Sequence, residues 1–211
     1  MYFFYFFELK CQNQKTEYLI IYIGINKPQG IKKLMNQRKL LIIRHAKSDW
    51  GNRELEDHDR PLNERGISNA PEMADRLKNL KIIPDAFFSS TALRAACTAK
   101  SFAQQLNFPD DKIHYDHDLY LASAGMLQDY VAQIDNSLAT VLIFSHNPGV
   151  TLLVSQVWKL NIGNIPTCGI VSLEFNNLDW EKASFNLPTS ATFDFPKNST
   201  EPISIPYRKI N

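Results

Sequence analysis

The sequence lacks the cysteine and glycine motifs of several enzyme classes. Its three cysteines, Cys11, Cys97 and Cys168, form no C-x-x-C pair, so they offer no metal site or redox disulfide and fit a reducing cytoplasm. No cysteine stands six positions before an arginine, which disfavours a thiolate phosphatase. No G-x-x-x-x-G-K-[ST] loop is present, so nothing indicates an ATP-dependent enzyme.

The sequence also lacks a net charge of either sign. Lys and Arg number 23 and Asp and Glu number 22, which gives a formal net charge of +1. So weak a net charge attracts neither nucleic acid nor an anionic membrane, so we expect no nucleic-acid partner, and any anion site must be local. A chain of 211 residues is long enough for one domain with a full core.

The first 34 residues contain no Ala, Val, Asp, Arg or Ser and are rich in Phe, Tyr, Ile, Lys, Asn and Gln. Their apolar runs are shorter than the ~20 residues that a membrane helix needs, so no stable membrane insertion is expected. No positive segment precedes the aromatic cluster, which disfavours a signal peptide. We expect residues 1–34 to be an atypical extension, untranslated with Met35 as the start, or disordered. A peripheral hairpin or membrane-contacting tail is the alternative.

Residues 35–211 are expected to form a single domain, because apolar strand-like runs alternate with helical periods as in layered α/β proteins. Strands are expected at 39–43, 86–89, 113–115, 140–144, 170–175 and 183–187. Helices are expected at 63–80, 93–106 and 125–134 and after Pro148. From about residue 188 the proline-rich tail is expected to be irregular.

Two of the strongest predicted strands end at a histidine. One leads into Arg44 and His45, another leads into His146, and a third ends shortly before Arg94. Ligands of open α/β sheets bind at the carboxyl ends of the strands, where helix N-termini present free N–H groups. We therefore expect these four side chains to converge on one edge of the sheet.

These side chains suit phosphoryl transfer. A histidine that attacks phosphorus needs an unprotonated ring nitrogen, and a guanidinium beside it disfavours the imidazolium form and binds phosphate oxygens. Arg44 and His45 form such a pair. A second imidazole can donate to the phosphoryl oxygens, and an arginine in a first helical turn faces an anion bound there. Each residue also has a purely structural interpretation, as a strand-end or capping residue.

Four ordered segments resemble the signatures of the histidine phosphatase superfamily. They read R-H-A-K-S-D-W from Arg44, D-H-D-R-P-L-N-E-R-G from Asp57, S-S-T-A-L-R-A-A-C-T-A from Ser89 and S-H-N-P-G from Ser145. The sequence is most similar to the short SixA-type members of the phosphoglycerate mutase-like branch, over about residues 39–175. The resemblance implies a phosphoglycerate mutase-like α/β fold, a three-layer αβα sandwich with a mostly parallel central sheet.

The resemblance also implies a phosphate pocket formed by Arg44, His45, Arg94 and His146. In this family-based interpretation His45 is the nucleophile and forms a phosphohistidine that water later hydrolyses. Ser48 and Asn52 are expected at the edge of the pocket. No metal and no cofactor are implied.

The general acid of the superfamily's mutases has no obvious equivalent here, because residues 116–123 read D-H-D-L-Y-L-A-S. An alkoxide leaves badly without a proton, whereas a protonated imidazole leaves phosphorus as a neutral amine. The stretch between Arg94 and His146 is also too short for a large cap. The sequence therefore favours a phosphohistidine-bearing protein as substrate, a phosphorelay or phosphotransfer carrier, in the cytoplasm.

Two other functions stay open. A small-molecule phosphomonoesterase using the same pocket would need an acid, for which the candidates are Asp49, Asp57, Asp59 and Asp118. A non-catalytic phosphate-binding module would need only the pocket. His114 and His117 lie among aspartates but are interpreted as solvated loop residues rather than metal ligands, and His58 as a surface residue.

Overall fold

A computed structural model of the chain describes residues 37–208, and the expectation for residues 1–34 lies outside the described residues. The strands are β1 (Gln37–Arg44), β2 (Ala86–Ser90), β3 (Ile113–Asp116), β4 (Thr140–Ser145), β5 (Ile170–Asn176), β6 (Ser190–Asp194) and β7 (Ile203–Ser204). The α-helices are α2 (Glu64–Asn79), α3 (Leu93–Gln105), α4 (Ala124–Ala132), α5 (Gly149–Leu152) and α6 (Trp180–Phe185). Short helical turns are η1 (Asp57–Asp59), η2 (Asp110–Lys112), η3 (His117–Leu119) and the π-helical η4 (Leu153–Val157).

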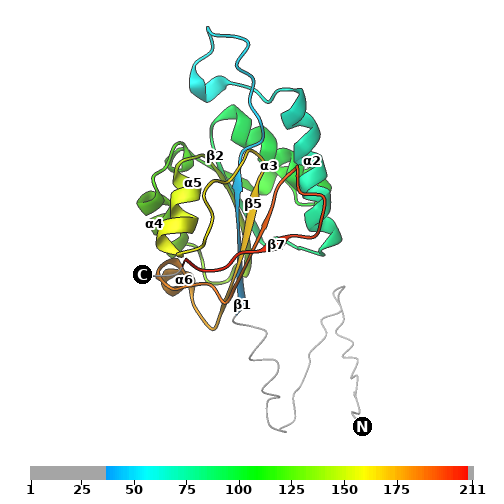
Figure 1. Cartoon of the computed structure of the whole chain (residues 1–211). Helices are drawn as coiled ribbons and strands as arrows, with labels where there is room; N and C mark the ends of the chain where they lie inside the picture. The colour runs from blue at the N-terminus through cyan, green and yellow to red at the C-terminus, as the bar shows by residue number, and fades with distance from the viewer. Residues whose placement is uncertain (1–36, 209–211) are drawn as a thin grey trace, which may run out of the picture.

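The strands form one sheet in the order β3-β2-β4-β1-β5-β6-β7 (Figure 1). From β3 to β1 neighbouring strands are parallel, and from β1 to β7 they are antiparallel. The central strand β1 carries a fully buried apolar run from Leu40 to Ile43, as expected of a strand covered on both faces. The predicted α/β class is confirmed, with an antiparallel extension beside the parallel half that carries the candidate site.

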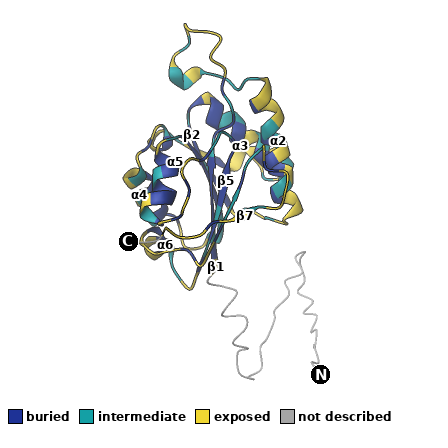
Figure 2. Ribbon diagram, in the orientation of Figure 1, coloured by how far each residue is buried: buried dark blue, intermediate teal, exposed yellow. Residues whose placement is uncertain are grey.

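Helices cover both faces of this sheet, and the buried residues concentrate between the layers (Figure 2). Leu41 and Ile43 belong to the core cluster that includes residues of α2 and α3. Leu40 and Ile42 belong to the cluster that includes residues of α4, α5 and α6. Successive residues of a strand point to opposite faces, so β1 holds the two outer layers together. No described helix is long and apolar enough to cross a membrane.

The start of α2 lies directly against the chain that follows β1. The Asn63 side chain caps the helix by accepting a hydrogen bond from the Gly66 N–H at 3.0 Å. A Cβ atom on Gly66 would lie 2.2 Å from the Lys47 carbonyl oxygen. Only glycine allows this approach, and the contact fixes the path of the chain just after His45.

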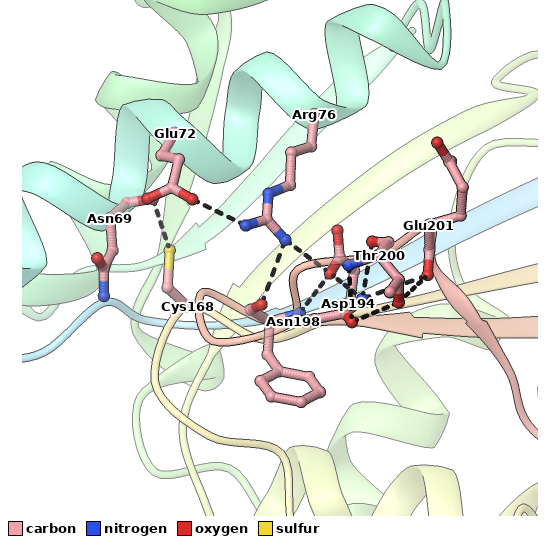
Figure 3. A network of polar contacts seen from close by, with 9 residues as sticks. Asn69, Glu72, Arg76, Cys168, Asp194, Asn198, Thr200 and Glu201 are labelled. Carbon is pink, nitrogen blue, oxygen red and sulfur yellow. Dashed lines mark hydrogen bonds and ion pairs between the residues drawn. The ribbon is translucent and has the colours of Figure 1, made fainter.

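The predicted irregular tail from about residue 188 is partly wrong. It supplies β6 and β7 to the sheet, and a partly buried polar network anchors the loop between them (Figure 3). Arg76 of α2 donates to Asp194 Oδ1 at 2.9 Å, and Asn198 Nδ2 donates to the same oxygen at 2.9 Å. The prolines of this segment predicted an irregular tail, but the pairing of β6 with β5 and the ion pair between Arg76 and Asp194 hold it in an ordered conformation.

The strand predicted at 183–187 is also wrong, because Trp180–Phe185 forms α6. Asp179 caps this helix by accepting from the Lys182 N–H at 2.9 Å. The fully buried Trp180 donates its indole N–H to the Leu138 carbonyl at 2.8 Å. Tertiary anchoring of one tryptophan thus outweighs a short apolar run that resembles a strand.

Candidate active site

The four predicted pocket residues lie together at the carboxyl ends of the parallel strands. Arg44 ends β1 opposite Ser145 of β4, so His45 and His146 follow side by side. Their ring centroids are 4.9 Å apart. Arg94, in the first turn of α3, brings its Nε to 3.4 Å from His45 Nε2. The convergence expected from the strand ends is therefore what the structure shows.

His45 is held as a neutral ring whose Nε2 accepts only a long hydrogen bond, of 3.4 Å, from Arg94 Nε. Its Nδ1 lies 2.7 Å from the Ala46 carbonyl oxygen, and the side chain is buried. A carbonyl oxygen only accepts, so Nδ1 carries the proton and Nε2 keeps its lone pair. Burial lowers the pKa of His45 to about 4, opposed by the Ala46 bond and reinforced by the charges of Arg94 and Arg44. At neutral pH, Nε2 is therefore available as a nucleophile.

His146 is also neutral. Burial lowers its pKa to about 2, and neighbouring His45 adds to the effect. Its Nε2 lies 2.8 Å from Ser90 Oγ, while its buried Nδ1 has no hydrogen-bond partner among the described residues. Arg44 donates from Nη1 to the Ile165 carbonyl at 2.8 Å, and its buried Nε also has no partner in the described part of the chain. Buried unpaired nitrogens of this kind suit an oxygen-rich anion.

Asp57 and Tyr120 complete the pocket. Arg94 donates from Nη2 to Asp57 Oδ2 at 2.8 Å and from Nη1 to the Asp57 carbonyl oxygen. The Tyr120 hydroxyl donates to the same Oδ2 at 2.8 Å, and its ring stands edge-on to His146 at a centroid distance of 5.5 Å. Burial would raise the pKa of Asp57, but the hydrogen bonds from Tyr120 and Arg94 outweigh it, and the pKa is lowered. Asp57 is thus an ionised carboxylate at neutral pH.

From the sequence, Asp57 was only one of four candidate acids, and Tyr120 had no expected role. The other three do not share its contact with Arg94, since Asp49 accepts from the Gly51 N–H and Asp59 pairs with His58. Asp118 is exposed. The available signal was the D-H-D-R-P-L motif, but nothing in it indicated that its first residue reaches the arginine of α3.

Ser48 and Asn52 are placed less favourably. Ser48 is buried and forms an isolated bridge with Leu62. Asn52 is exposed, and its Oδ1 accepts from the Glu54 N–H at 2.9 Å. Within residues 37–208 no hydrogen bond joins either side chain to the four pocket residues, so their roles at the pocket edge stay predictions.

His58 was expected to be a surface residue, but it lies beside the pocket. Its Nε2 is 3.0 Å from Thr91 Oγ1, and its ring centroid is 5.0 Å from that of Tyr120. His117 Nδ1 lies 3.3 Å from the same Thr91 hydroxyl. The described residues contain no group of three or more His, Cys, Asp or Glu side chains placed to hold a metal ion.

Thr98 ties the nucleophile to the arginine. Its hydroxyl accepts from the Ala46 N–H at 3.0 Å and donates to the Arg94 carbonyl at 2.6 Å. Gly149, at the start of α5, allows an equally tight contact, because a Cβ there would lie 1.9 Å from the Ala122 carbonyl oxygen. The segments around the pocket are therefore joined by one side-chain bridge, through Thr98, and by one close backbone contact, at Gly149.

Acid is expected to destabilise the fold because both pocket histidines are neutral when folded. Unfolded histidine has a pKa of about 6.5, whereas the folded values are about 4 for His45 and about 2 for His146. Between these pKa values the unfolded chain binds more protons than the folded chain. The contribution of the two neutral histidines to the free energy of unfolding is therefore complete above pH 6.5 and is lost as the pH falls. We expect a loss of about 4 kcal/mol from pH 7 to pH 5.

Urea unfolding at the two pH values measures this loss, and His146→Gln, which removes one of the two titrations, is expected to halve it. Equal stability of the wild-type protein at both values would contradict the neutral assignments.

Comparison with known proteins agrees with this geometry. Residues 40–129 match the model of the histidine phosphatase superfamily, branch 1. An uncharacterized chloroplastic protein of Arabidopsis thaliana is 30% identical over 154 residues, which cover 69% of this chain and 70% of the relative. The 2,3-bisphosphoglycerate-dependent phosphoglycerate mutase 2 of the same plant is 36% identical over 76 residues, which cover 35% of this chain and 22% of the mutase.

Among solved structures, the protein histidine phosphatase SixA complexed with tungstate is 25% identical and has a TM-score of 0.61. The match covers 74% of this chain and 94% of SixA. The residues matched by the family model include Arg44, His45 and Arg94 and end before His146, whereas the similarity to SixA covers most of the domain. The chain belongs to the histidine phosphatase superfamily, branch 1, and is a histidine phosphatase of the SixA type.

Proposed function

We propose that this enzyme removes the phosphoryl group from phosphohistidine on another protein through a covalent phospho-His45 intermediate. The observation that carries the proposal is the state of Asp57. Of the four candidate acids, Asp57 is the one that contacts Arg94. Arg94 and Tyr120 hold it as a carboxylate, so it carries no proton to donate. A substrate whose leaving group needs no enzymic acid suits such a pocket.

The chemistry follows from the nitrogens of the pocket. The phosphoryl oxygens accept from the N–H groups of Arg44, Arg94 and His146, and His45 Nε2 attacks phosphorus. The substrate P–N bond breaks, and its electron pair stays on the leaving imidazole, which departs neutral because its other nitrogen is protonated. Water then attacks phospho-His45, the P–Nε2 bond breaks, and the proton released by water ends on the phosphate. His45 returns to its neutral form.

The surroundings of the pocket suit a substrate presented on a protein surface. The chain between α3 and β4 is taken up by η2, β3, η3 and α4, which leaves no segment for a large cap over the phosphate. The SixA structure to which this chain is similar is that of a protein histidine phosphatase and holds tungstate, a tetrahedral oxyanion like phosphate. The proposed partner is a phosphorelay or phosphotransfer carrier in the cytoplasm.

The deciding experiment compares hydrolysis of a phosphohistidine-bearing carrier protein with that of a panel of phosphomonoesters, in EDTA. We expect the phosphoprotein to be strongly preferred. The similarity to a phosphoglycerate mutase favours a small-molecule phosphomonoesterase as the second candidate. Faster hydrolysis of monoesters, lost in His45→Ala, would establish that candidate instead, and no hydrolysis of either substrate would favour the binding module.

Asp57→Asn separates the two chemistries. The amide still accepts a hydrogen bond but cannot serve as an acid, so phosphohistidine turnover is expected to change by less than about 10-fold. If Asp57 instead served as the general acid for a phosphomonoester, its loss would reduce monoester turnover by ~10²–10⁴-fold. Steady-state rates on both substrates measure the difference, with Asp59→Asn as the control at an exposed aspartate two residues away. A loss above 100-fold on phosphohistidine would show that the reaction requires the carboxyl group.

A further inference from the structure

Ser90 makes a contact with His146 to which neither the sequence nor the proposed chemistry gives a role. It is the last residue of β2 and is fully buried. Its Oγ lies 2.8 Å from His146 Nε2 and also accepts from the Ala92 N–H at 3.2 Å. His146 is itself 1% exposed, so water does not compete freely for these groups.

The proton positions follow from counting donors and acceptors. Ser90 Oγ already accepts from Ala92, and a hydroxyl has one proton to donate. Among the described residues, His146 Nε2 is the only acceptor within hydrogen-bond reach of that proton. If Nε2 carried a hydrogen instead, the buried Ser90 O–H would have no partner, which is unfavourable. The arrangement therefore favours a bare Nε2 on His146 and a proton on Nδ1.

We infer that Ser90 is a positioning residue that fixes the tautomer of His146, so that its Nδ1–H is presented as a donor to the transferring phosphoryl group. The buried Nδ1 has no hydrogen-bond partner among the described residues, as expected of a donor kept for a ligand oxygen. The opposite tautomer would turn a lone pair toward an anion and repel it. Ser90 thereby makes His146 an electrophilic group rather than a second base.

The two neighbouring imidazoles are then given different tasks by their second nitrogens. His45 uses its Nδ1–H on the Ala46 carbonyl and leaves Nε2 free to attack. His146 accepts at Nε2 from Ser90 and leaves Nδ1–H free to donate. This assignment holds for any phosphoryl substrate of the pocket, so it does not depend on the choice between phosphohistidine and a monoester.

The test is the ¹⁵N NMR spectrum of the full chain labelled on its histidine rings, recorded with and without inorganic phosphate. The His146 signals are assigned by their loss in His146→Gln. We expect Nδ1 to be the protonated nitrogen in wild type, both without phosphate and in its presence. Protonation of Nε2 in wild type would overturn the inference, whatever the behaviour of any variant.

Variants of the serines supply the second arm. Ser90→Ala is expected to lower the Nδ1–H population and to reduce kcat by 10-fold to 100-fold, while Ser90→Thr, which keeps a hydroxyl, restores both. Ser89→Ala is the matched control, because the hydroxyl of this fully buried neighbour donates to the Ser90 carbonyl rather than to His146. An unchanged tautomer and unchanged kcat in a folded Ser90→Ala protein would also overturn the inference.

Discussion

His45→Ala is expected to reduce turnover by about 10⁴-fold or more, as removal of a covalent nucleophile does in other enzymes. The reason is the state of this imidazole, which is buried, neutral and oriented with Nε2 beside Arg94. No other described histidine shares that environment, since His146 has its Nε2 engaged by Ser90, His58 is half-buried, and His114 and His117 are exposed. Single-turnover reactions with ³²P-labelled substrate measure the loss.

The same experiment identifies the intermediate. Wild-type enzyme is expected to retain label in an acid-labile, base-stable form that maps to His45, and His45→Ala is expected to retain none. His114→Ala is the control, because this exposed histidine of β3 lies outside the pocket. Label on the His45→Ala protein, or full activity without any labelled enzyme, would rule out the covalent route.

Arg94→Ala is expected to lower kcat/KM by about 10³-fold, the lower end of the range for an arginine that stabilises a transferring phosphoryl group. Two losses combine. The guanidinium no longer faces His45 Nε2, and the Asp57 carboxylate loses its closest cation at the edge of an anion site. Arg94→Lys keeps the charge but not the planar fork, so it is expected to recover only part of the loss.

The double variant Arg94→Ala with Asp57→Asn tests the second part of this explanation. Because it removes the negative charge of Asp57 as well, we expect it to be more active than Arg94→Ala alone, in a double-mutant cycle. Lys100→Ala, an exposed position on the same helix, is the control for α3. A double variant no better than the single one would mean that Asp57 does not repel the substrate.

The core of the site was predictable because its residues stand at strand ends. A strand that ends in a histidine delivers it to the ligand-binding edge of a parallel sheet, which local sequence reveals for His45 and His146. Asp57 was harder to place because it reaches the pocket on a loop after β1, and its partners Arg94 and Tyr120 lie on other elements. Such a contact depends on tertiary packing and has no local pattern.

The secondary structure was likewise predictable where a local pattern determines it, and the prediction was wrong where distant contacts determine it. The buried strands and the long amphipathic α2 follow their periodicity. The helix α6 and the strand β6 depend on anchors distant in the sequence, such as the Trp180 indole on Leu138 and the Arg76 ion pair with Asp194. Short elements that are held by distant partners cannot be predicted from the pattern of a few neighbouring residues.

The central place of β1 also governs when catalytic ability arises during synthesis. Lys39 pairs with Thr140 on one side and with Glu174 on the other, so most of the domain must leave the ribosome before β1 is enclosed. Closing such long loops is slow compared with forming local helices. Until then His45 is hydrated and titrates normally, and the apolar run beside it is open to aggregation. The enclosure of β1 between its neighbouring strands thus makes His45 a reactive nucleophile and, in the same step, buries the apolar run that is prone to aggregate.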